Sequence, residues 1–182
     1  MDKAKTVINS FVVSRIDYCN ALLARSRKCV LDWLQYVLNA AARLIIGGHK
    51  YDHVSSAMCN QLHWLRIKEC IQYKLCLLVY KIINKTAPQY LSDMCTLVSD
   101  TDGRCRSRSA ADSRLGVPRT NTKFGDRAFN VAGPVAWNSL PSHIRASSSL
   151  ASFKRRLKTS FKKLVTVFLD SLVNCMSFTD NR

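Results

Sequence analysis

Acidic residues are scarce in this chain of 182 residues. Twelve Asp and Glu face 28 Lys and Arg, which gives a formal net charge of +16, and Glu69 is the sole glutamate. Metal-dependent phosphoryl or nucleotidyl transfer needs several converging carboxylates to hold the ions. Here the aspartates are scattered singly along the sequence. We therefore expect no autonomous polymerase or nuclease site, no catalytic residue, no metal site and no cofactor.

Long apolar runs are missing as well. The longest, at residues 75–80 and 164–169, fall far short of the roughly 20 residues that span a bilayer. No cleavage pattern of a signal peptide follows the first apolar stretch. Phosphate-binding glycine loops, nucleophile elbows and zincin motifs are absent. These absences predict an intracellular protein, in the nucleus or the cytoplasm, with no membrane partner; a basic membrane-surface protein is the distant alternative.

Eight cysteines raise the question of metal binding. The closest approach to a zinc set is Cys59, His63, Cys70 and Cys76, which lacks the paired, short-spaced ligands of structural zinc sites. Cys70 and Cys76 also fall on different faces of a predicted helix. We expect the cysteines to be small buried side chains kept reduced, except Cys105, which lies between two arginines in a polar loop and is expected to be exposed and reactive.

The excess of positive charge predicts a polyanionic partner, and nucleic acid is the first candidate. The imbalance is greatest in the second half, because no Asp or Glu occurs between residues 127 and 169. Lysines and arginines are frequent in the same stretch. Such a segment repels itself unless something anionic lies against it.

Apolar residues at spacings of three and four predict a helical domain over residues 1–98. The expected helices span residues 3–24, 30–45, 55–61 and 67–84, and a short helical turn is expected within residues 88–97. Gly47 and Gly48 are the predicted end of the second helix. Ser, Arg, Asp and Gly dominate residues 99–116, which is typical of a flexible basic loop.

The pattern of residues 117–170 predicts a small α+β module, and residues 171–182 are expected to form a tail. Short extended runs on both sides of a turn at residues 121–123 indicate a β-hairpin. A short helix over residues 131–140 follows, with Trp137 as its apolar anchor. The expected fold is therefore mainly α, a helical bundle followed by this module.

The last predicted helix begins at a serine cap within residues 147–149. It carries an apolar stripe of Leu and Phe, and its opposite face is Lys and Arg. Before it, Phe124 and Phe129 are expected to form a small core with Trp137, and Asp126 to pair with Arg127 or bond in a turn.

Eight cations are the candidate nucleic-acid-binding residues. One lies on the second helix, three in the expected hairpin region and four on the last helix: Arg43, Arg119, Lys123, Arg127, Lys154, Arg155, Lys158 and Lys162. The plainer interpretation of the last helix is a solvated basic face over a buried stripe. His63 and Trp64 are expected to be packed rather than catalytic, since no nucleophile or carboxylate stands near His63 in the sequence.

Six segments resemble one protein family both in their residues and in their order along the chain. They are SRIDYCNALL, NAAARLI, YDHVSSAMCNQLHWL, APQYLSD, VPRTNTKFGDRAFNVAGPVAWNSLP and SLASFKRRLKT, which together cover roughly residues 7–164. The chain is similar to the C-terminal region of the reverse transcriptase polyprotein of jockey-like non-LTR (LINE) retrotransposons. It departs from the family pattern at Arg66, where a proline is usual, and at Lys85 and Thr86, where Gly-Leu is frequent.

The resemblance implies a thumb-like helical bundle and a post-thumb module of an RNA-directed DNA polymerase. The aromatic-x-Asp-Asp box and the endonuclease of such polyproteins have no counterpart in this sequence, so we expect a non-catalytic fragment, a truncated or degenerate copy. Its basic surfaces are expected to contact template RNA or target DNA. The alternative is a structural module that packs on the palm and fingers of the parent polymerase and binds no nucleic acid itself.

Overall fold

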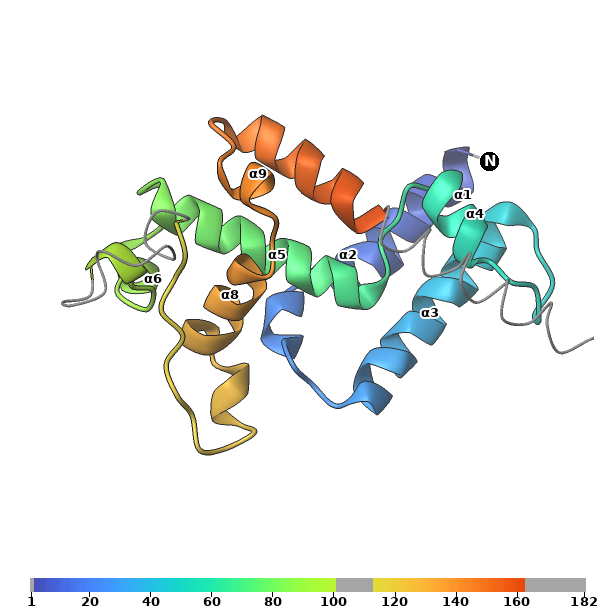
Figure 1. The fold of residues 1–182 in the computed structure, drawn as a ribbon. Coiled ribbons are helices and arrows are strands. Elements are labelled where there is room, and N and C mark those ends of the chain that lie inside the picture. Colours follow the sequence, from blue (N-terminus) through green and yellow to red (C-terminus); the bar gives the residue numbers. More distant parts are fainter. Residues whose placement is uncertain (1, 101–112, 163–182) are drawn as a thin grey trace, which may run out of the picture.

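A computed structural model describes residues 2–100 and 113–162 of the chain. Helices hold 66% of these residues and strands hold none, so the expected mainly α fold is confirmed at that level. Helix α5 (Ile67–Ile83) crosses the middle of the molecule (Figure 1). The helix over residues 150–162 lies on one side of α5, and α8 (Phe129–Asn138) lies on the other.

The first helical segment breaks sooner than its apolar spacing predicts. Helix α1 (Asp2–Ile8), the π-helical stretch η1 (Asn9–Val13) and α2 (Ser14–Asp17) follow one another directly. Cys19 then takes a left-handed φ of 52°, and Asn20 Nδ2 donates to Asp17 Oδ1 over 3.0 Å. Such local side-chain bonds compete with the helix. The predicted helix over residues 3–24 is therefore wrong beyond residue 17, and a separate 3-10 turn, η2 (Asn20–Leu23), follows.

Three predicted helices form close to their expected positions. Helix α3 (Lys28–Ile46) ends at Gly47, whose φ of 76° is the left-handed conformation of a glycine cap. Helix α4 (Ser55–Asn60) is short. At the start of α5, the N–H of Ile67 donates to Gln35 Oε1 of α3 over 3.0 Å. This bond satisfies one of the free N–H groups at the helix start and ties α5 to α3.

The expected β-hairpin is wrong, because residues 113–128 form no strand. After α5 the described chain also forms short helical elements, which are α6 (Gln89–Ser92), η3 (Val98–Asp100), η4 (Gly125–Arg127) and α9 (Ser142–Arg145). Leu115 makes only an isolated bridge with Leu97. Asn138 of α8 supplies the remaining partners: its Nδ2 donates to the oxygen of Leu115 over 2.8 Å, and its Oδ1 accepts the N–H of Leu115 over 3.0 Å.

One hydrophobic core runs through both expected domains. Phe153, which is 0% exposed, stacks on Tyr80 of α5 with ring centroids 4.3 Å apart and an interplanar angle of 18°. Its ring also lies 5.8 Å from that of Trp137, which is 1% exposed. The loop expected at residues 99–116 therefore does not separate two cores.

The aromatic side chains expected to form a small core differ in how deeply they are buried. Trp137 is buried as predicted, and its Nε1 donates to the oxygen of Ser113 over 2.9 Å. Phe129 is half-buried, but Phe124 is 82% exposed, so the small core expected to include it is wrong in that respect. Asp126 accepts a hydrogen bond from the hydroxyl of Thr120. Of the two contacts expected for Asp126, a turn hydrogen bond and an ion pair with Arg127, the structure therefore shows the first.

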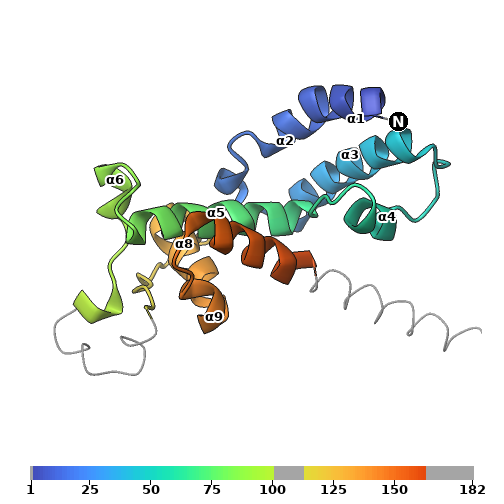
Figure 2. The same ribbon diagram turned by 90° about the horizontal axis from the view of Figure 1, so that it is seen from above.

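Several large apolar side chains of the N-terminal helices are exposed. Figure 2 shows α1 running beside α3, and η1 also contacts α3. The exposed side chains of η1 and α3 include Phe11 (73% exposed), Trp33 (73%) and Leu44 (74%). Within the described residues, α3 is the one helix with the length and mean hydropathy, 1.3, of a membrane span. This is weak evidence for a membrane partner, because the core helices of many water-soluble proteins meet the same criteria.

Candidate nucleic-acid interface

The helix over residues 150–162 carries half of the predicted cations, four of the eight. It begins after Ser149, whose Oγ accepts the N–H of Ser152 over 3.2 Å, so the predicted serine cap is confirmed. Phe153, Leu157 and Phe161 form its buried stripe, at 0%, 0% and 5% exposure. Burial of this stripe against α5 and α8 fixes which face of the helix is turned to solvent.

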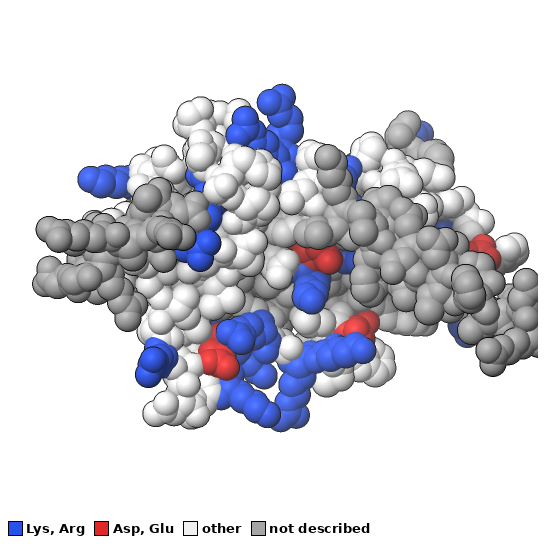
Figure 3. All heavy atoms as spheres, in the orientation of Figure 1, with Lys and Arg blue, Asp and Glu red and all other residues white. Residues whose placement is uncertain are grey.

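Four predicted cations lie on this helix outside its buried stripe, and three of them form the lysine row. Lys154, Lys158 and Lys162 follow at four-residue steps along one flank, and Arg155 lies on the other flank. No carboxylate contacts Lys154, Arg155 or Lys158 within the described residues. Figure 3 shows Lys and Arg side chains projecting over this helix at the upper edge, with no Asp or Glu beside them in that view. The structure thus brings these four cations together on one edge of the molecule.

The end of the lysine row is attached to the link between α4 and α5. Lys162 is half-buried, and its Nζ lies 3.1 Å from His63 Nδ1. The His63 side chain is exposed, so the expectation of a packed side chain is wrong for His63, whereas Trp64 is half-buried against the core. His63 has a left-handed φ of 58°, which turns its ring away from the core that Trp64 faces.

The cations of the expected hairpin lie elsewhere. Arg119 and Lys123 are exposed in the segment before η4, on the side of α5 opposite to the helix over residues 150–162 (Figure 1). Arg127 is half-buried, and its Nε is enclosed without a hydrogen-bond partner within the described residues. These three cations therefore lie apart from the lysine row and do not extend it.

Arg43 has a structural contact of its own. Its Nε and Nη2 both donate to the backbone oxygen of Asp52, over 3.2 and 3.1 Å. Asp52 Oδ2 in turn accepts the N–H of His49 over 2.7 Å. The guanidinium of Arg43 thus holds the loop that follows α3, and a role for it in binding stays a prediction.

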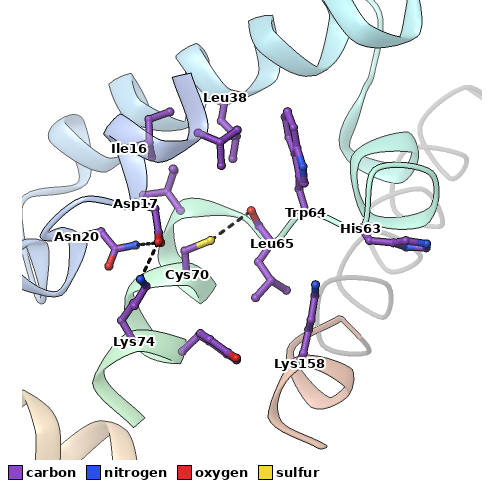
Figure 4. Close-up of a pocket in the computed structure, with 13 residues that line it drawn as sticks. Ile16, Asp17, Asn20, Leu38, His63, Trp64, Leu65, Cys70, Lys74 and Lys158 are labelled. Carbon is purple, nitrogen blue, oxygen red and sulfur yellow. Dashed lines mark hydrogen bonds and ion pairs between the residues drawn. The ribbon is translucent and has the colours of Figure 1, made fainter. Parts of the chain in front are cut away.

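A pocket that the sequence did not reveal lies beside the lysine row (Figure 4). Lys158 lines it from the helix over residues 150–162, and Trp64 lines it from the link before α5. At its far end Lys74 Nζ lies 2.6 Å from Asp17 Oδ2. The three charged residues come from separate parts of the chain, so no local sequence signal could have indicated the pocket.

The expectation that the cysteines are buried holds for Cys59 and Cys76, holds in part for Cys70 and Cys95, and is wrong for Cys19 and Cys29. Burial raises the pKa of both Cys70 and Cys76 to about 12, so their thiols stay protonated at neutral pH. Cys19 and Cys29 are exposed instead, and Cys105 lies outside the described residues. The described part of the chain holds no group of three or more His, Cys, Asp or Glu side chains placed to bind a metal ion.

The geometry of this edge is one that an extended anion can contact. It offers a row of ammonium and guanidinium groups on the outer face of a packed helix, with an apolar pocket along one flank. Comparison of the chain with protein-family models, with curated proteins and with solved structures finds no match. The resemblance to reverse transcriptases therefore rests on the sequence segments alone.

Proposed function

We propose that the chain is a nucleic-acid-binding module without catalytic activity of its own. The observation that carries the proposal is the edge formed by Lys154, Arg155, Lys158 and Lys162, the first three of which no described carboxylate contacts. Lysines and arginines that neutralise phosphates release condensed counterions, and this release drives binding that is independent of sequence. An edge of this kind on a helix fixed by its buried stripe is a suitable surface for a phosphate backbone.

The resemblance to LINE-type reverse transcriptases gives this module its proposed context. In that interpretation the helices within residues 1–98 correspond to the thumb-like domain, and residues 117–170 correspond to the post-thumb module. The partner is then template RNA or target DNA of an RNA-directed DNA polymerase whose palm and fingers belong to the parent polyprotein. The mainly helical fold is compatible with that context, and the polymerase chemistry is assigned to the parent protein.

The salt dependence of binding tests the proposal. If the four cations neutralise about four phosphates, log affinity for a DNA duplex falls with log salt at a slope near −3.6 from this edge alone. Replacing Lys154, Arg155, Lys158 and Lys162 with glutamine should flatten the slope by about 0.9 for each phosphate that is no longer neutralised. Filter binding over a salt series, on wild type and the quadruple variant, measures both slopes.

A charge-matched variant separates the edge from the general positive charge. Lys3, Lys28, Lys68 and Lys85 are exposed and lie on other elements, and their replacement with glutamine removes the same formal charge. This control should bind nearly as tightly as wild type. Circular dichroism checks that the quadruple variant keeps its helices, since Phe153, Leu157 and Phe161 are untouched.

A second candidate function is a packing module that binds no nucleic acid. The observation that favours it is the exposure of large apolar side chains on the N-terminal helices, with Phe11, Trp33 and Leu44 more than 70% exposed. Large exposed apolar patches usually mark protein interfaces. If wild type and the quadruple variant bind nucleic acid equally, or neither binds, this second function is the better account.

A further inference from the structure

The pocket beside the lysine row has the size of a small-molecule site. Its volume is about 330 Å³, within the range of ligand pockets in proteins. Ile16 and Leu38 line it from α2 and α3, and Trp64 and Tyr73 supply aromatic surface from the link before α5 and from α5 itself. Figure 4 shows Ile16, Leu38, Trp64 and Leu65 facing the same space. Walls of this kind suit a flat, mainly apolar group.

The charged side chains around the pocket differ in whether an oppositely charged side chain already contacts them. Asp17 is already engaged by Lys74, 2.6 Å away, and by Asn20. The Cys70 thiol donates to the oxygen of Leu65 and is neutral, because burial raises its pKa. Lys158 is the cation at the mouth that no described carboxylate contacts, and its ammonium points toward the pocket (Figure 4). A guest that fits therefore has a flat body and an anionic group close beside it.

The lysine row continues this arrangement along the helix. Lys154, Lys158 and Lys162 are four residues apart, which advances a helix by about 6 Å at each step. Successive phosphates of an extended strand can follow such a row. A strand lying along it would place one nucleotide with its phosphate at Lys158 and its base beside Trp64.

We propose that the pocket receives one unpaired nucleobase of a single strand whose phosphates lie along Lys154, Lys158 and Lys162. This inference rests on the proposed nucleic-acid-binding function and narrows its substrate to single-stranded or locally unpaired nucleic acid. Proteins that bind single strands combine a basic groove with aromatic side chains that stack on bases. A paired base inside a duplex cannot enter the pocket, so the surface discriminates against duplexes without reading their sequence.

The test compares probes that differ only in their bases. Fluorescence anisotropy measures binding of wild type to an oligodeoxyadenylate of about 12 nucleotides, within the site sizes of single-strand binders. A strand of the same length made of abasic sites carries the same phosphates. We expect the abasic strand and the matching duplex to bind at least about tenfold more weakly, as expected for loss of one stacked base.

A variant that fills the pocket gives a second measurement. Ile16→Phe adds volume to the pocket wall, and Leu44→Phe adds a ring at a position that is 74% exposed on the outer face of α3. Ile16→Phe should bind the intact and the abasic strand equally, whereas Leu44→Phe should keep the difference. Because the abasic comparison uses the unmodified protein, the result stands even if Ile16→Phe fails to fold.

The outcomes separate this inference from the function on which it rests. If no strand and no duplex binds, the proposed function fails. If wild type binds intact, abasic and duplex probes with equal affinity, the function stands and the pocket assignment is overturned. Displacement of the strand by an acidic, aromatic peptide that binds more tightly, and that Ile16→Phe no longer binds, would overturn it in favour of a protein partner.

Discussion

Phe153 is the residue whose removal should most directly detach the basic helix from the rest of the molecule. Its ring is 0% exposed, stacks on Tyr80 at 4.3 Å and lies 5.8 Å from Trp137. Replacement by alanine removes these contacts and leaves a cavity, and buried Phe→Ala substitutions cost about 3–5 kcal/mol. Since whole domains are stable by about 5–15 kcal/mol, this single change removes a large share of the free energy of unfolding.

Two further variants show whether the destabilisation comes from the aromatic stack or from volume alone. Phe153→Leu keeps most of the apolar volume but removes the ring pairing, which is worth about 0.5–1.5 kcal/mol. Phe124→Ala removes a ring that is 82% exposed, so its effect should stay within about 0.5 kcal/mol. Urea unfolding followed by far-ultraviolet circular dichroism, with equal m-values required for comparison, gives all three free energies.

The Phe153 variants also test nucleic-acid binding, because the buried stripe of Phe153, Leu157 and Phe161 positions the lysine row. At a urea concentration where Phe153→Leu is folded, its affinity for nucleic acid should match that of wild type, since its cations are unchanged. A destabilisation below about 1 kcal/mol in Phe153→Ala would refute the packing of this helix against α5 and α8, because a cavity in a closed core costs more than that.

Two other perturbations follow from the backbone and from the buried thiols. Gly47→Ala places a side chain at a φ of 76° with no heavy atom within 4 Å, so it should cost about 1 kcal/mol through backbone strain alone; Gly48→Ala, where no such φ occurs, should cost less in the same urea assay. Burial raises the pKa of Cys70 and Cys76 from the ordinary value of 9.0 to about 12, so the stability that comes from keeping these thiols protonated is complete below about pH 9 and falls as the pH rises toward 12. Unfolding midpoints measured under reducing conditions across this range should decline, and Cys76→Ala should decline less steeply; equal slopes for the two proteins would contradict the assigned cause.

The helices that the sequence predicts well are those whose limits are set locally. The end of α3 follows from a glycine at the cap, and the start of the helix over residues 150–162 follows from Ser149. The break after Asp17 was not predictable from apolar spacing, because η2 continues the same spacing after a turn. The helix ends where Cys19 takes a left-handed φ and Asn20 bonds to Asp17, and apolar spacing does not report either feature.

Apolar periodicity also does not show which apolar stripe of a helix packs against another element of the fold. Phe11 and Leu22 fit the apolar spacing that predicts a helix over residues 3–24, yet both are more than 70% exposed. The hairpin prediction was wrong for a related reason. The backbone of Leu115 bonds to the side chain of Asn138, 23 positions away in the sequence, and its neighbours Arg114 and Gly116 bond to the backbone of Val98 and Thr96. Apolar spacing contains no information about such long-range pairing.

The candidate site illustrates the same division between local and long-range information. The lysine row could be predicted from the sequence because four-residue spacing on a helix places side chains on one face. The pocket beside it requires Asp17, Lys74 and Lys158 to meet, and only the packed fold brings them together. On the helix over residues 150–162, each lysine of the row directly follows a residue of the buried stripe, at positions 153/154, 157/158 and 161/162. Substitutions in the row therefore change charge beside the pocket without changing the core, so weaker binding by a folded variant reports on the surface itself.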